Sequence, residues 1–253
     1  MFPMSLQPRT RNPRRWFVST PAGSWSNFQP LSLSPSLWFD ASNASSITSS
    51  SGLVSQWNDL SGNGRHLTQG TSANQPTTGV TTQNGLNVIN YNGSTSGMAT
   101  ATSVANFTMV HVFVVAKSVS SNRTIIGVPH DLAASPPYMR WSIYHNGTSG
   151  YETRLNGNLR QSAQGVFTPS NPNIFRLESD EGDGFIGRTK VLDSGAVTTL
   201  TYPNVVPMRL GFTLANTQVL NGFFAEVLVF NRRLNEIEKD RVITYLNTKW
   251  AVY

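Results

Sequence analysis

The stretch WNDLSGNGRH at positions 57–66 places one carboxylate and two amides close together in the chain. Ca²⁺ takes six to eight oxygen ligands from carboxylates, amides and carbonyls, and the candidate calcium ligands here are Asp59 and Asn63. A structural interpretation competes with this one, because Asp and Ser side chains bond to nearby backbone amides and Gly62 and Gly64 permit positive φ. One carboxylate is few for a tight site, so a structural loop is favoured and calcium is the alternative.

A second candidate chemistry is carbohydrate binding by the aromatic segment YMRWSIY at 138–144. Sugars are commonly held by exposed rings with amide and carboxylate partners. The candidate contacts are Tyr138, Trp141 and Tyr144. The alternation of the segment favours a position in the core for Tyr138 and Trp141, so both interpretations stay open.

The first 30 residues form a basic, aromatic segment that predicts an extended arm. They hold four arginines and no acidic residue, and their prolines break regular structure. Aromatic rings among arginines are typical of a segment that orders when it docks on a partner. We predict partner contacts at Arg11, Arg14, Arg15, Trp16 and Phe17. The alternatives are packing across the arm's own domain and nucleic-acid binding, which is not expected because four arginines make a weak phosphate footprint.

Several kinds of site are disfavoured by residue type. The chain has no cysteine, which excludes disulfides and zinc sites built on thiolates. Its histidines are scattered, without the short spacing of metal sites; they are His66, His111, His130 and His145. No apolar run is long enough for a membrane span, and no apolar core follows the early positive charge as a secretory signal would require.

Composition and turn signals predict an all-β domain over residues 31–253. Charged residues make up 13% of the chain, well below the roughly 25% usual for soluble domains. Short apolar or alternating runs between turn signals indicate at least eight strands, which is typical of a two-sheet antiparallel β-sandwich or jelly roll. The apolar run at 107–118 predicts a central strand buried on both faces. The other clear runs lie at 122–128, 138–147, 151–160, 173–195 (a hairpin), 206–214 and 222–232.

One amphipathic helix is predicted at 235–250. Asn235 suits the N-cap, acidic residues fill the first turn, and Lys249 lies in the last turn. The predicted apolar face should dock on the sandwich. It consists of Ile237, Val242, Ile243, Leu246 and Trp250.

The order of several motifs resembles a known family. The motifs are SLWFDASNASSIT (36–48), VSQWNDLSGNGRHLTQ (54–69), NGLNVINYNGSTSGM (84–98) and the closing GFFAEVLVFNRRLNEIEKDRVITYLNTKW. Together they are similar to LamG-like jelly-roll domains of the concanavalin A-like lectin/glucanase superfamily, particularly to those in bacteriophage structural proteins. The resemblance covers roughly residues 31–253. It implies two packed antiparallel sheets and no single function, because the fold hosts lectins, glycosidases, adhesins and structural domains.

The resemblance directs attention to ESDEGD at 178–183, because glucanases of this fold carry closely spaced carboxylates on one strand. Glu178, Asp180 and Asp183 imitate that spacing loosely, but the last is Asp in place of Glu, and Gly182 and Gly184 predict a turn. Neither a G-x-S-x-G elbow nor a phosphate-binding glycine motif occurs. We therefore predict no catalytic residue and expect that the protein is not an enzyme.

These features favour a bacteriophage virion structural protein, either a capsid decoration protein or a head or tail fibre. In this hypothesis the arm anchors the chain to other virion proteins and the jelly roll faces out. We expect a homo-oligomer, made in the host cytoplasm without a signal peptide and located in the virion. The alternative is a lectin-like adhesin that binds cell-surface glycans for host attachment, with or without calcium. A glycoside hydrolase is the third class.

Overall fold

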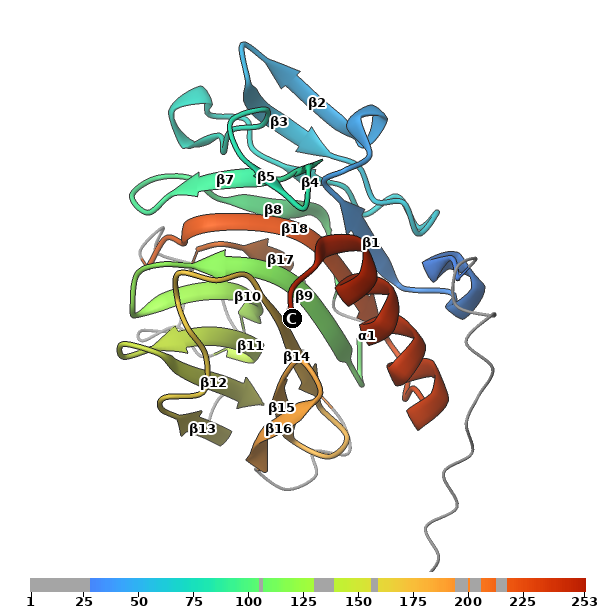
Figure 1. Ribbon diagram of the computed structural model, residues 1–253. Helices are drawn as coiled ribbons and strands as arrows, with labels where there is room; N and C mark the ends of the chain where they lie inside the picture. The colour runs from blue at the N-terminus through green and yellow to red at the C-terminus, as the bar shows by residue number, and fades with distance from the viewer. Residues whose placement is uncertain are drawn as a thin grey trace, which may run out of the picture.

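The protein consists of two large antiparallel sheets and one C-terminal helix, as the computed structural model in Figure 1 shows. The prediction of an all-β sandwich with a single helix at the C-terminus is confirmed. The structure describes residues 28–104, 107–129, 139–155, 159–193, 200, 206–212 and 218–253.

The seven-stranded sheet runs in the order β1-β18-β9-β14-β15-β16, with β7 also beside β18. Its strands are β1 (Leu37–Asp40), β7 (Ile89–Asn92), β9 (His111–Ser118), β14 (Asn173–Glu178), β15 (Asp183–Ile186), β16 (Thr189–Asp193) and β18 (Asn221–Phe230). The predicted hairpin at 173–195 is thus three strands, because a second turn separates β15 from β16.

The nine-stranded sheet runs in the order β13-β12-β11-β10-β17-β8-β4-β3-β2. Its strands are β2 (Ile47–Ser50), β3 (Leu53–Trp57), β4 (Leu67–Thr68), β8 (Met98–Ser103), β10 (Arg123–Pro129), β11 (Met139–Asn146), β12 (Gly150–Leu155), β13 (Leu159–Ala163) and β17 (Pro207–Leu210). A small separate sheet pairs β5 (Thr82–Gln83) with β6 (Leu86–Asn87). Short 3₁₀ helices occur at Pro30–Leu33, Ala44–Ser46 and Ser72–Asn74.

Strand β9 is the central buried strand that the apolar run predicts. It lies between β18 and β14, and its alternate side chains enter two different cores. Val112 and Val114 pack between the two sheets, whereas Phe113 and Val115 pack under the helix. The seven-stranded sheet is therefore covered on both faces, which explains why the run is apolar without alternation.

Helix α1 (Glu236–Trp250) covers the outer face of the seven-stranded sheet. A capping box starts it, in which Asn235 Oδ1 accepts from the Glu238 amide at 3.0 Å and Glu238 Oε2 accepts from the Asn235 amide at 2.9 Å. The predicted apolar face is buried except for Ile237, which is 62% exposed. At about 100° per residue, Ile237 lies roughly 160° around the helix from Lys239, and Lys239 occupies the buried face in its place. Within the described ranges, no helix is long and apolar enough to cross a membrane.

Candidate functional site

The outer face of the nine-stranded sheet carries polar and charged side chains in register. On β11, Trp141 is fully buried between the sheets, so alternation places Ser142 and Tyr144 on the outer face. The pairing with β12 sets Ser142 opposite Arg154 and Tyr144 opposite Glu152. Side chains from two neighbouring strands therefore meet on the face that is turned away from the core.

These side chains form an outer-face cluster of Tyr144, Asn146, Glu152 and Arg154. Nε of Arg154 donates to Oε1 of Glu152 at 2.7 Å, and Nδ2 of Asn146 donates to Oε2 of Glu152 at 2.9 Å. The Arg154 guanidinium carbon lies 5.5 Å from the centre of the Tyr144 ring. The buried carboxylate thus orients the guanidinium over the ring, while Arg154 itself keeps 28% of its side chain exposed.

The three predicted carbohydrate contacts have different positions. Tyr144 lies in the outer-face cluster, although most of its surface is buried. Trp141 is fully buried in the core, so its ring is not at the surface. Tyr138 lies outside the described residues. The structure thus brings one of the three to the outer face and adds Glu152 and Arg154 beside it.

Farther across the same face, β4, β8 and β17 form a hollow of about 300 Å³, here called the Arg209 hollow. The register places Arg209 opposite Ala99, and Ala99 opposite Thr68, so all three share the outer face. Two loops complete the wall of the hollow. Its lining residues are Thr68, Gln69, Gly70, Thr71, Asn74, Thr95, Gly97, Ala99, Arg209 and Phe212.

An aromatic ring supports the guanidinium in this hollow. The Phe212 ring lies directly on Gly97, where an added Cβ would be 2.3 Å from Phe212 Cδ1. Glycine at this position therefore lets the ring lie against the backbone just before β8. The Arg209 guanidinium carbon lies 4.8 Å from the centre of that ring, which fixes the plane of the cation.

The chemistry of the Arg209 hollow is mostly neutral and polar. Among the described residues that line it, Arg209 is the one with a charged side chain, and hydroxyl and amide groups make up most of the rest. Burial lowers the pKa of Arg209, because removal from water disfavours the charged form. Amides, hydroxyls, one cation and a ring are the groups that bind sugar hydroxyls and an acidic substituent.

The loop at 57–66 is closed by its own hydrogen bonds. Asp59 Oδ1 accepts from the backbone amides of Trp38 at 3.1 Å and Ser61 at 2.9 Å, and Oδ2 accepts from the Arg65 amide at 3.1 Å. Asn63 Nδ2 donates to the Ser36 carbonyl at 3.2 Å. The carboxylate thus serves as a backbone acceptor, as the structural interpretation expects, and calcium binding by Asp59 and Asn63 stays a prediction. In the described part of the chain, no group of three or more His, Cys, Asp or Glu side chains is placed to hold a metal ion.

The described histidines have separate partners. Nδ1 of His66 accepts from the Asp59 amide at 3.1 Å, Nε2 of His111 lies 2.6 Å from Asp180 Oδ1, and Nδ1 of His145 lies 2.9 Å from Ser118 Oγ. His111 and His145 are buried, and burial lowers the pKa of both. His130 lies outside the described residues.

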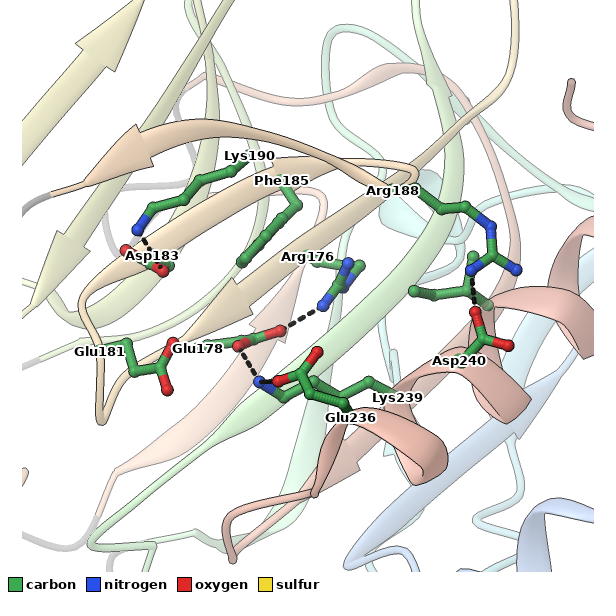
Figure 2. Close-up of a pocket in the computed structure, with 11 residues that line it drawn as sticks. Arg176, Glu178, Glu181, Asp183, Phe185, Arg188, Lys190, Glu236, Lys239 and Asp240 are labelled. Carbon is green, nitrogen blue, oxygen red and sulfur yellow. Dashed lines mark hydrogen bonds and ion pairs between the residues drawn. The ribbon is translucent and has the colours of Figure 1, made fainter. Parts of the chain in front are cut away.

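Figure 2 shows the pocket between β14, β15, β16 and α1, which is lined by three carboxylates of ESDEGD: Glu178, Glu181 and Asp183. Glu178 ends β14 and Asp183 begins β15, directly opposite each other, so the segment turns as predicted. Glu178 bonds to Arg176 through Oε1 and to Lys239 Nζ through Oε2 at 2.6 Å. Asp183 Oδ2 lies 2.7 Å from Lys190 Nζ. Glu178 and Asp183 are thus both paired with cations.

The remaining carboxylate that the sequence singles out, Asp180, lies at the turn. Asp180 contacts His111 and also Arg233 Nε at 3.1 Å. Burial raises the pKa of Asp183, against the opposing effect of Lys190. Because Lys239 belongs to α1 and Glu178 to β14, the pocket joins the helix to the hairpin, and this contact gives Glu178 a structural role.

The predicted arm contacts Arg11, Arg14, Arg15, Trp16 and Phe17 lie outside the described residues, so partner binding by the arm stays a prediction. The described end of the arm touches the domain. The ring of Phe28 packs edge-on against Tyr245 of α1, with 5.6 Å between ring centres. Residue 28 therefore packs on its own chain, as one of the alternatives for the arm proposes.

Sequence reasoning missed Arg209, Phe212, Glu152 and Arg154. A signal for the last two is present in YETRL at 151–155, where alternation places a carboxylate and a guanidinium on one face of a strand. No comparable local signal marks Arg209 or Phe212, because their partners come from residues 68–74 and 95–99.

The comparisons with known proteins identify the fold but no protein family. No family model and no curated protein matches the sequence. Among solved structures, the chain is similar to Trypanosoma rangeli sialidase in complex with sialic acid, at 12% identity and a TM-score of 0.58, over 84% of this chain and 33% of that chain. It is also similar to domain 4 of AbnA, a GH43 extracellular arabinanase from Geobacillus stearothermophilus, in complex with arabinotriose. That match has 11% identity and a TM-score of 0.55, over 83% of this chain and 97% of the domain.

These matches correct one prediction and leave another unsupported. The chain spans about a third of the sialidase, and identities this low show the fold alone. The expectation that the protein is not an enzyme is wrong as an inference from fold and motif, because the similar structures are parts of glycoside hydrolases. The two antiparallel sheets agree with a jelly roll of concanavalin A-like type, whereas no match links the chain to a bacteriophage. What the comparisons identify is a β-sandwich fold that occurs within carbohydrate-active proteins.

Proposed function

We propose that the protein binds carbohydrate at the Arg209 hollow. The observation that carries the proposal is the hollow's lining, in which one guanidinium over an aromatic ring stands among neutral hydroxyls and amides. Support comes from the fold, because a domain of almost the same extent was solved with arabinotriose. Carbohydrate binding of this kind suits the lectin-like adhesin that the sequence raises as an alternative.

Each group in the hollow has a role in this proposal. Thr68, Thr71 and Asn74 present hydroxyl and amide groups that exchange hydrogen bonds with sugar hydroxyls. Arg209 binds an acidic substituent such as a carboxylate, since guanidinium and carboxylate form paired, charge-assisted bonds. Phe212 acts through Arg209, because its ring is almost fully buried and holds the guanidinium plane. An acidic sugar is therefore expected to bind more tightly than its neutral counterpart.

The test is direct titration by calorimetry with sialic acid and arabinotriose, after a screen on a glycan array. The substitution Arg209→Gln should weaken binding of an acidic sugar about 10-fold to 100-fold, the loss expected when a hydrogen bond to a charged group is removed. The matched control is Arg241→Gln, which removes one positive charge from an exposed position of α1, on the opposite sheet. Equal affinities for the two variants, or no glycan bound by the native protein, would contradict the proposal.

A further inference from the structure

Gln69 follows β4 and lines the Arg209 hollow, and both polar atoms of its side chain have a partner. Nε2 donates to the Gly97 carbonyl at 2.7 Å. Oε1 accepts from the Thr71 amide at 3.1 Å. One side chain therefore links the two loops that wall the hollow, which are residues 69–75 and 92–97.

The loop 69–75 carries hydroxyl and amide groups that are proposed to meet a sugar, and Gln69 also holds the two ends of this loop together. The Gln69 carbonyl accepts from Nε2 of Gln75 at 2.8 Å, which closes the loop. Within the loop, Thr71 precedes the short 3₁₀ helix Ser72–Asn74, but its side chain makes no capping bond to that helix. The exposed Thr71 hydroxyl is therefore not needed as a cap and can bond to a ligand.

The bond from Gln69 to Gly97 acts on the other side of the hollow. Gly97 is the residue on which the Phe212 ring lies, and that ring supports the Arg209 guanidinium. The Gly97 carbonyl accepts from Gln69, and the Gly97 amide donates to the Asn74 carbonyl at 3.1 Å. These two hydrogen bonds fix the backbone of Gly97 relative to the opposite loop. The position of the ring, and through it the position of the cation, therefore depends on this connection.

Such connections matter for binding, because a loop that must become ordered when a ligand binds opposes association. A loop that hydrogen bonds already hold in the binding geometry does not add this cost. Loss of the Gln69 side chain would leave the hydroxyl, amide and guanidinium groups of the hollow present, but it would remove the bonds that fix their relative positions. Affinity should then fall for every sugar that the hollow accepts, without a change in which sugar is preferred.

We propose that Gln69 is the positioning residue of the Arg209 hollow and holds the hollow in its binding geometry before a sugar arrives. This inference rests on the proposed function, since it takes the ligand of the hollow to be carbohydrate. Gln69 acts through Thr71 on the loop that offers hydroxyl and amide groups, and through Gly97 on the ring beside Arg209. Its role differs from that of Arg209, which distinguishes acidic sugars from neutral ones in the proposed function.

The experiment uses the full chain and calorimetric titration with sialic acid, which is acidic, and arabinotriose, which is neutral. Gln69→Met keeps the length of the side chain and removes both of its hydrogen bonds. It should weaken the binding of both sugars about 5-fold to 30-fold, as expected for the loss of two ordinary hydrogen bonds, and should leave the ratio of the two affinities unchanged. In the sugar-free protein, amide hydrogen exchange at Thr71 and Gly97 should be faster in this variant, because both amides lie in segments that Gln69 holds.

The matched control is Gln83→Met, which removes a side-chain bond of the same kind, to the Trp250 carbonyl at 2.8 Å, outside the lining of the hollow. This control should bind both sugars like the native protein. Native affinities for Gln69→Met, or a loss confined to sialic acid, would overturn the role of Gln69 and leave the proposed function standing. Weaker binding with unchanged hydrogen exchange at Gly97 would also overturn it, because Gln69 would then be a direct contact. A native protein that binds neither sugar would contradict the proposed function and this inference together.

Discussion

The outer faces of the two sheets both carry charged side chains, but they use them differently. On the seven-stranded sheet, the charges lie under α1 and are paired within the fold. Glu226 of β18 is fully buried and accepts from Trp38, Tyr245, Lys249 and Trp250 at 2.8–2.9 Å. At the other end of the helix, Glu178 bonds to Lys239 and Arg176.

On the nine-stranded sheet, by contrast, Arg209 stands over a ring in a hollow whose other described lining residues are neutral. The two faces thus differ in whether their charged side chains are paired within the fold or lie at a hollow. The charges under α1 hold the helix on the sheet, whereas we propose that Arg209 binds a ligand. Substitutions of similar chemistry on the two faces should therefore affect different properties.

The largest expected effect is at Glu226. Glu226→Gln should lower the free energy of unfolding by about 3–5 kcal/mol, because four donors lose their charged acceptor inside the fold, although Lys249 keeps its bond to Asp40 Oδ2 at 2.6 Å. Urea unfolding followed by tryptophan fluorescence measures it. The control Arg188→Gln breaks an exposed pair with Asp240 and should change stability by less than about 1 kcal/mol. Equal stability of the two variants would show that Glu226 does not hold the helix.

A smaller loss is expected at the start of α1. Lys239→Met keeps the side chain's apolar stem and removes the ammonium group that bonds to Glu178 at 2.6 Å. Because Glu178 retains Arg176, the expected loss is about 2–3 kcal/mol in the same unfolding experiment. A variant as stable as the native protein would mean that Arg176 alone compensates the buried carboxylate.

Substitution on the outer face of the nine-stranded sheet should change the affinity for sugar much more than the stability of the fold. Arg209→Gln should change the free energy of unfolding by about 1 kcal/mol or less, because it removes one cation–π contact with Phe212. Burial lowers the pKa of Arg209, so its charge is not favoured by the fold itself. The same protein sample should show the weaker binding of acidic sugars described above. A large loss of stability in this variant would erase the contrast between the two faces.

A pH dependence of stability is also expected at His111, which contacts Asp180 in the turn. Burial lowers the pKa of His111 below its usual value near 6.5, in spite of Asp180. As pH falls below about 6.5, the unfolded chain takes up a proton before the native protein does. Stability should then fall by at most about 1.4 kcal/mol for each pH unit, until the folded pKa is reached.

The check is to compare the native protein with His111→Gln between pH 8 and pH 5. The difference between the two stability curves gives the contribution of His111 alone, because Glu226 is present in both proteins. Burial raises the pKa of Glu226, so its effect on stability has the opposite sign. Glu226 favours the folded state at low pH, and that contribution is lost as pH rises from about 4.5 toward its folded pKa. Parallel curves for the two proteins would contradict the assignment to His111.

Local patterns were sufficient for most elements of the fold. The apolar run at 107–118 predicts the doubly buried β9, and Asn235 with Glu238 predicts the start of α1. Trp141 in the core follows from alternation in β11. These features depend on residues a few positions apart, whose geometry the backbone period fixes. A carboxylate inside GFFAEVLVF was a further local sign, because an acidic residue in a buried strand requires donors.

The sequence by itself thus determined the all-β class, the single helix and the turn at ESDEGD. The Arg209 hollow was decided by the tertiary structure. Arg209 and Thr68 line one hollow only because β17 and β4 both border β8. Pairing of strands far apart in the chain depends on the packing of the whole sandwich, so no short stretch of sequence contains it.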